Sequence, residues 1–494
     1  MSIKKLKDFL ESNYTILLTL EIGLISWLVK SSVLCVISFA VLVSLIFIIC
    51  NDPKGAFPSL FFISFFIQVI DDNYPLAIYL TCIFIVLGSI IYFIIKTIKS
   101  KKCTKGRLFY PMIIADIAFL LGGIIGNFNI INIACVLFMA LCMYLFYWIT
   151  INTCTDLKQF MYIVLTCGGF IICIQFIVLN LYTGKFISSI QNQSILYIGA
   201  QNKNVAALFI TIGMIACLTL AQKRKYDYLY FLLASFMVLV CALTLCRTMI
   251  LLSILFYIGL SINVLAKSNN KIIFSSIIGG LVLVSLGIGI STDLIYKLID
   301  SVVEKINSGM NGRSELWAWC LERFIKHPLL GYGFISPTPV PTITGDFGII
   351  LAHNTPLQLL TSTGVIGTIL IGYFYFAKYK LCAENKDNRF LFLIIIMIEL
   401  SGLTDQAACM DPFICLVIFG ILGTMEIFNK PNAVSENENI RYENAEDKDD
   451  KDDKDNKVRN ESEKYENIKE ENTLITKKTK RKTSHKGTQK QPEN

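Results

Sequence analysis

Apolar runs of about twenty residues, separated by short polar connections, fill most of the chain as far as residue 429. Each run is long enough to cross roughly 30 Å of hydrocarbon as a helix. About fourteen such spans are expected, at 14–29, 33–50, 56–70, 76–95, 108–126, 130–150, 159–182, 204–221, 228–246, 249–266, 272–291, 356–377, 390–407 and 412–428. The pattern predicts an all-α polytopic membrane protein with about 12–14 transmembrane helices.

One polar stretch interrupts this pattern, from about residue 292 to 355. Two segments within it, 293–307 and 314–326, repeat apolar residues at helical spacing, so each predicts a short amphipathic helix. Such helices suit the membrane interface, where Trp317 and Trp319 are expected to anchor the second one. The stretch is therefore expected to be one large loop that carries short helices.

The next membrane span has a clear predicted start. Thr355-Pro356-Leu357-Gln358 fits a capping box, with Thr355 as the N-cap residue and Pro356 at the first helical position. His353 then lies two residues ahead of a helix N-terminus, whose positive end disfavours imidazolium and favours both a neutral base and a nearby anion.

Composition and charge agree with a membrane protein and set its orientation. Only 17% of residues are charged and the mean hydropathy is +0.59. The segment 430–494 has sixteen basic and sixteen acidic residues, so the whole net charge of +8 lies in residues 1–429. Basic residues gather in alternate turns, among them 96–107 and 378–389, the second of which includes Lys378. The positive-inside rule then puts both termini in the cytoplasm and the large loop outside.

The two ends of the chain differ in character. The N-terminal apolar run is long for a signal peptide and has no small-residue cleavage site, so a first membrane helix is expected. Residues 430–494 are rich in charge and poor in hydrophobic residues, which predicts a disordered cytoplasmic tail. The bland interpretation of the tail is a solvated charge run; the sharper one is that its basic end contacts anionic lipid.

Three residues stand out as candidates for chemistry at the predicted outer face. Arg247 lies between two apolar spans, where an arginine is costly unless it is paired or functional. Arg313 begins the second amphipathic segment, and arginine is the preferred planar donor for phosphate. His353 is the candidate general base. The structural alternatives are a turn anchor for Arg247, a solvated ion-pair partner for Arg313 and a packing or capping role for His353.

The segments around these residues resemble the O-antigen ligase and O-antigen (capsule) polymerase family. The likeness is carried by Gly199-Ala-Gln-Asn-Lys-Asn204, Leu243-Thr-Leu-Cys-Arg247, Arg313-Ser-Glu-Leu-Trp317, His327-Pro-Leu-Leu-Gly-Tyr-Gly333 and His353-Asn354 with Leu359 to Gly367. Gly402-Leu-Thr and Asp411-Pro-Phe continue it, so the family-like core covers about 195–430. Cys246 stands where the family usually has serine.

This resemblance implies an integral glycosyltransferase of the bacterial cytoplasmic membrane. It would move a glycan from a polyprenyl diphosphate carrier, such as undecaprenyl diphosphate, to an acceptor hydroxyl outside the membrane. His353 would be the base, and Arg247 and Arg313 would hold the diphosphate. The expected partners are the lipid-linked donor, a glycan or lipid-linked acceptor, membrane lipids and other polysaccharide-assembly proteins, with no nucleic acid. Base-assisted direct displacement would invert the anomeric centre.

Several alternatives stay open at this point. No cysteine pattern for zinc is present, and two arginines could neutralise the diphosphate, so neither a metal nor another cofactor is expected. His327, before Pro328, is interpreted as structural, and Glu21, Asp116 and Glu399 receive no role despite lying in apolar spans. The alternative function is a secondary transporter or a flippase for lipid-linked sugars, although no internal repeat is evident. Polymerase and ligase are not distinguished.

Overall fold

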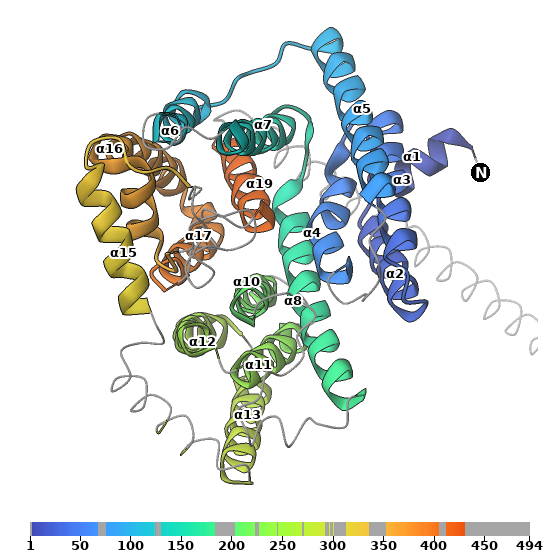
Figure 1. The fold of residues 1–494 in the computed structure, drawn as a ribbon. Coiled ribbons are helices and arrows are strands. Elements are labelled where there is room, and N and C mark those ends of the chain that lie inside the picture. The colour runs from blue at the N-terminus through green and yellow to red at the C-terminus, as the bar shows by residue number, and fades with distance from the viewer. Residues whose placement is uncertain are drawn as a thin grey trace, which may run out of the picture. The chain divides into compact units, whose positions relative to one another are not determined.

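A computed structural model describes residues 2–67, 76–122, 124, 130–182, 203–222, 227–244, 246–268, 271–291, 296, 300, 313–334, 352–404 and 412–429. The described chain is all-helical (Figure 1). Every one of the fourteen predicted spans overlaps a helix, and six helices are long and apolar enough to cross a membrane, with further shorter apolar ones beside them. The predicted all-α multi-pass membrane fold is therefore confirmed. The tail at 430–494 and most of the predicted helix at 293–307 lie outside the described residues.

The described residues form sixteen α-helices. Their bounds are α1 Ile3–Leu10, α2 Tyr14–Leu28, α3 Ser32–Ile49, α4 Ala56–Ile67, α5 Leu76–Ser100, α6 Phe109–Leu121, α7 Ile130–Thr153, α8 Leu157–Tyr182, α10 Lys203–Ala221, α11 Asp227–Leu243, α12 Arg247–Lys267, α13 Lys271–Ser291, α15 Arg313–Lys326, α16 Thr355–Ala383, α17 Arg389–Ser401 and α19 Pro412–Phe428. Two 3-10 turns, η1 Pro53–Gly55 and η4 Lys386–Asn388, precede α4 and α17.

Helix α10 is the centre of the packing. All of its residues from Ala206 to Ala221 are buried, and it contacts α8, α11, α12 and α17 (Figure 1). Its crossing with α8 depends on two glycines, because a Cβ added at Gly169 would lie 2.9 Å from the Gly213 Cα. Small residues let membrane helices approach closely where apolar lipid supplies no hydrophobic drive for association.

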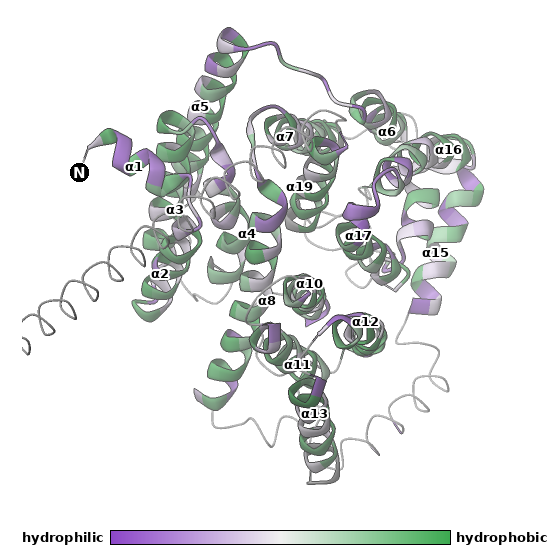
Figure 2. Ribbon diagram, turned by 180° about the vertical axis from the view of Figure 1, so that it is seen from behind, coloured by the Kyte–Doolittle hydropathy of each residue, from purple (hydrophilic) through white to green (hydrophobic). Residues whose placement is uncertain are grey.

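The outer helices expose apolar side chains instead of covering them. Phe84 on α5 is 69% exposed, Ile272 on α13 is 84% exposed and Leu283 on α13 is 71% exposed. Figure 2 shows the same arrangement, with hydrophobic helices throughout the bundle and hydrophilic residues mainly at helix ends, in connections and on α15. A continuous exposed apolar surface is what a protein surrounded by lipid requires.

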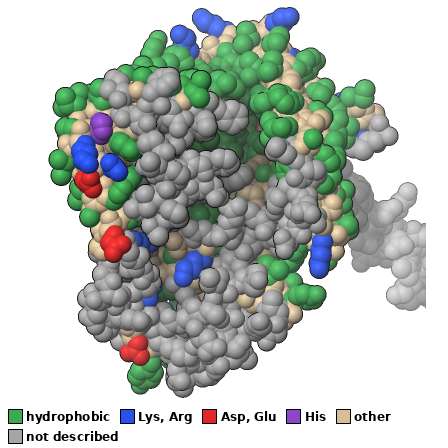
Figure 3. Space-filling view, in the orientation of Figure 1, with side chains coloured by type: hydrophobic (Ala, Val, Ile, Leu, Met, Phe, Trp, Pro, Cys, Tyr) green, Lys and Arg blue, Asp and Glu red, His purple; other side chains and the backbone are tan. Residues whose placement is uncertain are grey.

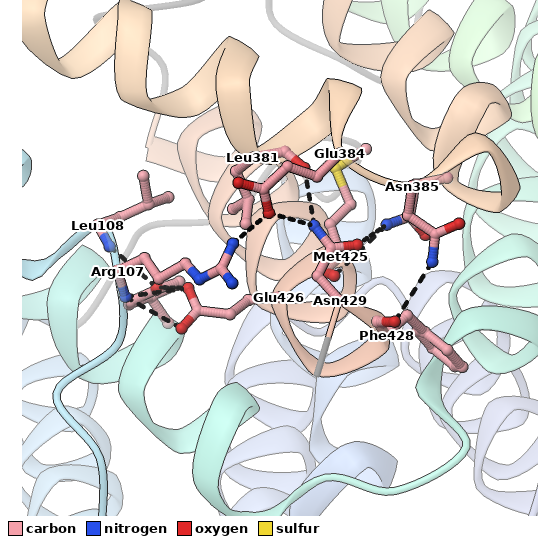
Figure 4. Close-up of polar contacts among 11 residues, drawn as sticks. Arg107, Leu108, Leu381, Glu384, Asn385, Met425, Glu426, Phe428 and Asn429 are labelled. Carbon is pink, nitrogen blue, oxygen red and sulfur yellow. Dashed lines mark hydrogen bonds and ion pairs between the residues drawn. The ribbon is translucent and has the colours of Figure 1, made fainter. Parts of the chain in front are cut away.

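Polar contacts close one end of the bundle (Figure 4). The Glu426 carboxylate of α19 accepts hydrogen bonds from the backbone N–H of Arg107, at 3.0 Å, and from the hydroxyl of Tyr147. The Arg107 guanidinium pairs with Glu384, the residue that follows α16. Asn429 donates to the Leu381 carbonyl at 2.9 Å. These bonds fix the C-terminal ends of α16 and α19 to the connection before α6.

Four turns meet at this same end. Asp52, before η1, accepts hydrogen bonds from the backbone N–H and the hydroxyl of Thr155. Lys101 donates to the Asn152 carbonyl, and Lys158 donates to the Asp387 carbonyl. The charge pattern assigns all four turns to one side of the membrane, and these contacts agree with that grouping. The compartment that this end faces stays a prediction.

Candidate active site

Asn354, not Thr355, is the N-cap residue of α16. Its backbone is extended and its side-chain oxygen accepts a hydrogen bond from the Leu357 N–H at 2.9 Å. Thr355 is the first helical residue, and its own N–H donates to the Gly402 carbonyl at 2.7 Å. The predicted N-cap position is therefore wrong by one residue. The N–H of Thr355 instead binds the Gly402 carbonyl at the end of α17, which fixes Thr355 as the first helical residue.

His353 lies directly before this cap, in an uncommon backbone conformation. Its φ is 47°, in the left-handed region that few non-glycine residues adopt. The backbone of Ala352 is fixed on both sides: its carbonyl accepts from Trp317 Nε1 at 3.0 Å, and its N–H donates to Gln358 Oε1 at 2.8 Å. Residues held in strained conformations by their surroundings cluster at functional sites.

Asn354 fixes the other flank of His353. Its side-chain Nδ2 donates to the Leu403 carbonyl at 3.0 Å, so one asparagine both caps α16 and binds the end of α17. The imidazole is half-buried between these anchors. Bonds on both sides therefore fix the backbone from which the His353 side chain extends.

Helix α16 is broken at Gly364 into two arms, a feature that the sequence analysis does not predict. Gly364 has φ 64° and ψ −170°, which is outside the helical region and essentially restricted to glycine. The N–H groups of Val365 and Ile366, which begin the second arm, donate to the carbonyls of Pro328 and Leu329 at 2.8 and 3.0 Å.

The segment His327–Gly333 closes this break from both sides. The N–H groups of Tyr332 and Gly333 donate to the carbonyls of Thr361 and Ser362, near the end of the first arm, at 2.8 and 3.0 Å. Four backbone bonds therefore join this segment to the broken helix. The break is therefore stabilised by specific hydrogen bonds. Through them, two of the segments that resemble the family, His327–Gly333 and Leu359–Gly367, contact each other.

Replacing Gly364 by alanine should lower the free energy of unfolding by roughly 3 kcal/mol, since alanine is strained in this conformation. An added Cβ would also lie 2.5 Å from the Leu329 carbonyl. Thermal unfolding of the purified protein in detergent measures the effect. Gly259→Ala on α12 is the matched control, because a Cβ there meets open space. Equal melting temperatures for the two variants would contradict the described break.

Helix α15 lies across the direction of α10 and α12, which Figure 1 shows nearly end-on. Leu316 and Cys320 are its buried face, and Arg313 is its first residue. Trp317, for which the sequence predicts an anchor at the membrane interface, donates its indole N–H to the Ala352 carbonyl beside His353. Its interfacial position stays a prediction. Figure 3 shows acidic and basic side chains side by side along the margin where α15 lies.

The other aromatic residues of this region pack against one another. Trp319 meets Tyr332 edge-on at 6.3 Å, and the Arg323 guanidinium lies 5.0 Å from the Trp319 ring. The His327 ring lies 5.4 Å from Tyr332, which agrees with its structural interpretation. This cluster supports α15 over the broken helix.

Arg247 is the first residue of α12, after Cys246, and it is half-buried. Helix α12 packs against α10, α11 and α17, and α17 ends at the backbone that holds Thr355 and Asn354. Arg313 begins the helix that carries Trp317, whose indole N–H binds the Ala352 carbonyl next to His353. Arg247 begins α12, which packs against α17, and the end of α17 binds Asn354 and Thr355. Gly199–Asn202 of the upstream motif lies outside the described residues.

One ion pair between α16 and α17 is not predicted from the sequence. Lys378, which the charge pattern assigns to a turn, lies inside α16, is 2% exposed and pairs with Glu399 of α17 at 2.5 Å. Its ammonium also lies 3.7 Å from the centre of the Tyr375 ring. That assignment to a turn is therefore wrong, since a neutralising carboxylate and an aromatic face allow the lysine to be buried. The sequence holds one indication of this pair, since Glu399 is an acidic residue within an apolar span and such a residue requires a partner.

A cavity of about 580 Å³ is lined on one side by both arms of α16 and on the other by α17 and the residues at its C-terminal end. Thr355 and Pro356 line it beside His353, while Tyr379 and Glu399 line it farther along. Most of the remaining lining is aliphatic. In the described part of the chain, no three His, Cys, Asp or Glu side chains gather as a metal site, and the metal-free expectation stays a prediction.

The fold and this arrangement define a class: a multi-pass helical membrane protein in which an amphipathic helix and a broken helix fix the backbone around a histidine. This histidine lies two residues before Thr355, the first lining residue of a largely aliphatic cavity. Residues 193–372 match a family model described as O-Antigen ligase. The match includes Arg247, Arg313, His327–Gly333 and His353, and it confirms the family resemblance over that segment. No curated protein shows a significant match to the chain.

Proposed function

We propose that this protein is an integral membrane glycosyltransferase that moves an oligosaccharide or longer glycan from a polyprenyl diphosphate carrier to an acceptor hydroxyl on the extracytoplasmic side. The observation that carries the proposal is the support of His353. It has a constrained left-handed backbone beside an apolar cavity, within a segment that matches the O-antigen ligase model. A lipid-linked substrate needs a reactive group that is reached from the bilayer, and this arrangement offers one.

In the proposed reaction His353 accepts the proton of the acceptor hydroxyl. The hydroxyl oxygen forms a bond to the anomeric carbon as the bond from that carbon to the diphosphate oxygen breaks. The leaving polyprenyl diphosphate takes the electron pair, and Arg247 and Arg313 neutralise its charge. One displacement inverts the anomeric centre, and no metal is needed for it. A second glycan as acceptor makes the enzyme a polymerase, and a different acceptor makes it a ligase.

The orientation is part of the proposal. Basic residues favour the cytoplasm for the end of the bundle closed by Arg107 and Glu426. The half of α16 that begins after Gly364 runs toward that end and finishes at Glu384, which pairs with Arg107. His353 then lies on the extracytoplasmic side of the Lys378–Glu399 pair.

The test is reconstitution of the full chain in proteoliposomes with a radiolabelled oligosaccharide on polyprenyl diphosphate. We expect a new glycosidic product and one released polyprenyl diphosphate per bond. Movement of intact donor across the bilayer without a new bond would identify a flippase instead. A chelator should leave the rate unchanged, and its loss on chelation would contradict the metal-independent mechanism.

Replacing either Arg247 or Arg313 by alanine should raise the KM for the donor roughly 10- to 150-fold, because a charge-assisted hydrogen bond contributes about 1.5–3 kcal/mol. Initial rates against donor concentration measure the change. Arg389→Gln is the control, since Arg389 begins α17 at the opposite end and packs on Phe390. An unchanged KM in both arginine variants would contradict the diphosphate assignment.

A further inference from the structure

Helix α2 lies at the edge of the bundle, where it packs against α3 and α4 (Figure 1). Small and polar residues, Thr15, Thr19, Gly23 and Ser26, are prominent on its buried face. Each of the three hydroxyls donates to a backbone carbonyl about one turn earlier, and the Thr19 hydroxyl also lies 3.2 Å from that of Ser59 on α4. The hydroxyl groups that α2 turns toward the bundle are therefore all partnered.

The opposite face of α2 is exposed, and its residues recur at coiled-coil spacing. Tyr14, Leu17, Glu21, Leu24 and Leu28 follow one another at alternating intervals of three and four residues, and all of them are exposed. Leu17 is 54% exposed and Leu28 is 79% exposed. This alternation places the side chains on one seam, as in helices that pack lengthwise against a partner helix. We call these residues the α2 seam.

An acidic residue stands at the middle of the α2 seam. Glu21 is the eighth of the fifteen residues of α2, an apolar helix. It therefore lies roughly 10 Å along the helix from either end. Its side chain forms no hydrogen bond or ion pair within the part of the chain that the structure describes. A charged group at such a depth in hydrocarbon is costly unless it is paired.

The other acidic residues inside the described membrane helices, away from the helix ends, are less exposed. Glu426 is buried, Glu399 is paired with Lys378, and Asp116 is half-buried. The neighbouring helix α3 exposes a stripe at similar spacing that is entirely apolar, namely Leu34, Ile37, Val41, Leu45 and Ile48. Lipid alone can cover the stripe on α3, whereas the α2 seam contains a carboxyl group that lipid chains do not satisfy.

We propose that the α2 seam binds a transmembrane helix of another membrane protein, and that this helix carries a lysine or an arginine opposite Glu21. Charge complementarity selects this partner, because a basic side chain neutralises the carboxylate and loses its own unpaired charge in the same contact. A second copy of the chain lacks this complementarity. In a two-fold pair the same face meets itself, which would place one Glu21 carboxylate against the other.

Photocrosslinking in proteoliposomes tests the proposal with synthetic partners of known sequence. In the full chain, p-benzoylphenylalanine replaces Leu24 on the α2 seam or, as the matched control, Ile83 on α5; these side chains are similarly exposed, at 41% and 48%. The partners are leucine-alanine transmembrane peptides with lysine, glutamine, glutamate or leucine as the one central residue. We expect capture of the lysine peptide from the α2 seam and background capture from α5.

Variants at Glu21 measure the contribution of the charge. Glu21→Leu should lower capture of the lysine peptide roughly 5- to 30-fold, the factor that corresponds to an interhelical polar contact of about 1–2 kcal/mol. Its melting temperature should not fall, because Glu21 makes no bond within the described residues that leucine would remove. Glu21→Lys should capture the glutamate peptide in preference to the lysine peptide, since the two charges are exchanged.

Three results would overturn the proposal. Equal capture of the lysine and leucine peptides, or capture that Glu21→Leu leaves unchanged, would assign the α2 seam to lipid. Equal capture of the glutamine and lysine peptides would overturn the choice of a basic partner. Crosslinks between two copies of the chain without peptide, lost in Glu21→Leu, would make the second copy the occupant. Transfer activity enters none of these readouts, so the proposed function is tested separately.

Discussion

His353→Ala should lower the turnover number of glycosyl transfer by about 100- to 10,000-fold, the usual contribution of a positioned general base. The KM for the donor should change little, because in the proposed reaction Arg247 and Arg313, and not His353, bind the diphosphate of the donor. Folding should be largely preserved, since the bonds that Ala352, Asn354 and Thr355 make to neighbouring segments remain in the variant. Steady-state rates and melting temperature of the purified variant measure the two effects.

His327→Ala is the matched control for that loss. His327 lies in the same region, and its ring packs 5.4 Å from Tyr332, which favours a structural role. We expect a lower melting temperature and a turnover number near that of the wild type. A His353→Ala protein with full turnover, or equal losses in the two variants, would rule out the assignment of His353 as the base.

Lys378→Met should lower the free energy of unfolding by about 3–5 kcal/mol, the cost of removing one partner from a buried ion pair. Glu399 then keeps a charge in an apolar environment without the ammonium 2.5 Å away. Adding Glu399→Gln to the same chain should recover most of the loss, because the uncompensated charge disappears. Reversible unfolding in mixed micelles measures all three free energies.

The exposed pair on α15 provides the comparison. Lys326 and Glu322 lie 2.6 Å apart with about half of each side chain exposed, so Lys326→Met should leave stability unchanged within error. If Lys378→Met is no less stable than Lys326→Met, the lysine does not compensate a buried carboxylate. The wall of the cavity would then differ from the one described.

Hydrophobic pattern alone predicts the helices of this protein well. Membrane spans depend on summed hydropathy over about twenty residues, a property that is local in sequence. The amphipathic helix α15 is also predicted, from Leu316, Cys320 and their neighbours, because its periodicity is local. The break at Gly364 is not predicted, since glycine is tolerated in membrane helices and its conformation depends on four backbone bonds to the distant segment His327–Gly333.

The candidate site shows the same division between local and distant information. His353 and Arg313 are found by residue type and position, but the support of His353 depends on Trp317, Gln358 and Leu403, which come from three different segments. Asn354 and Thr355 are both good N-cap residues, and a bond to Gly402 selects between them. From the sequence alone, Lys378 is assigned to a loop because lysine is rarely buried. Its place inside α16 depends on the ion pair with Glu399, which is distant in sequence.

Nuclear magnetic resonance of the transfer product tests the central claim most directly. The donor is an oligosaccharide of defined anomeric configuration on polyprenyl diphosphate, supplied to the full chain with an acceptor glycan. The account predicts a new glycosidic bond of inverted configuration, formed together with released polyprenyl diphosphate. A bond of retained configuration, or intact donor that has only crossed the bilayer, would contradict it.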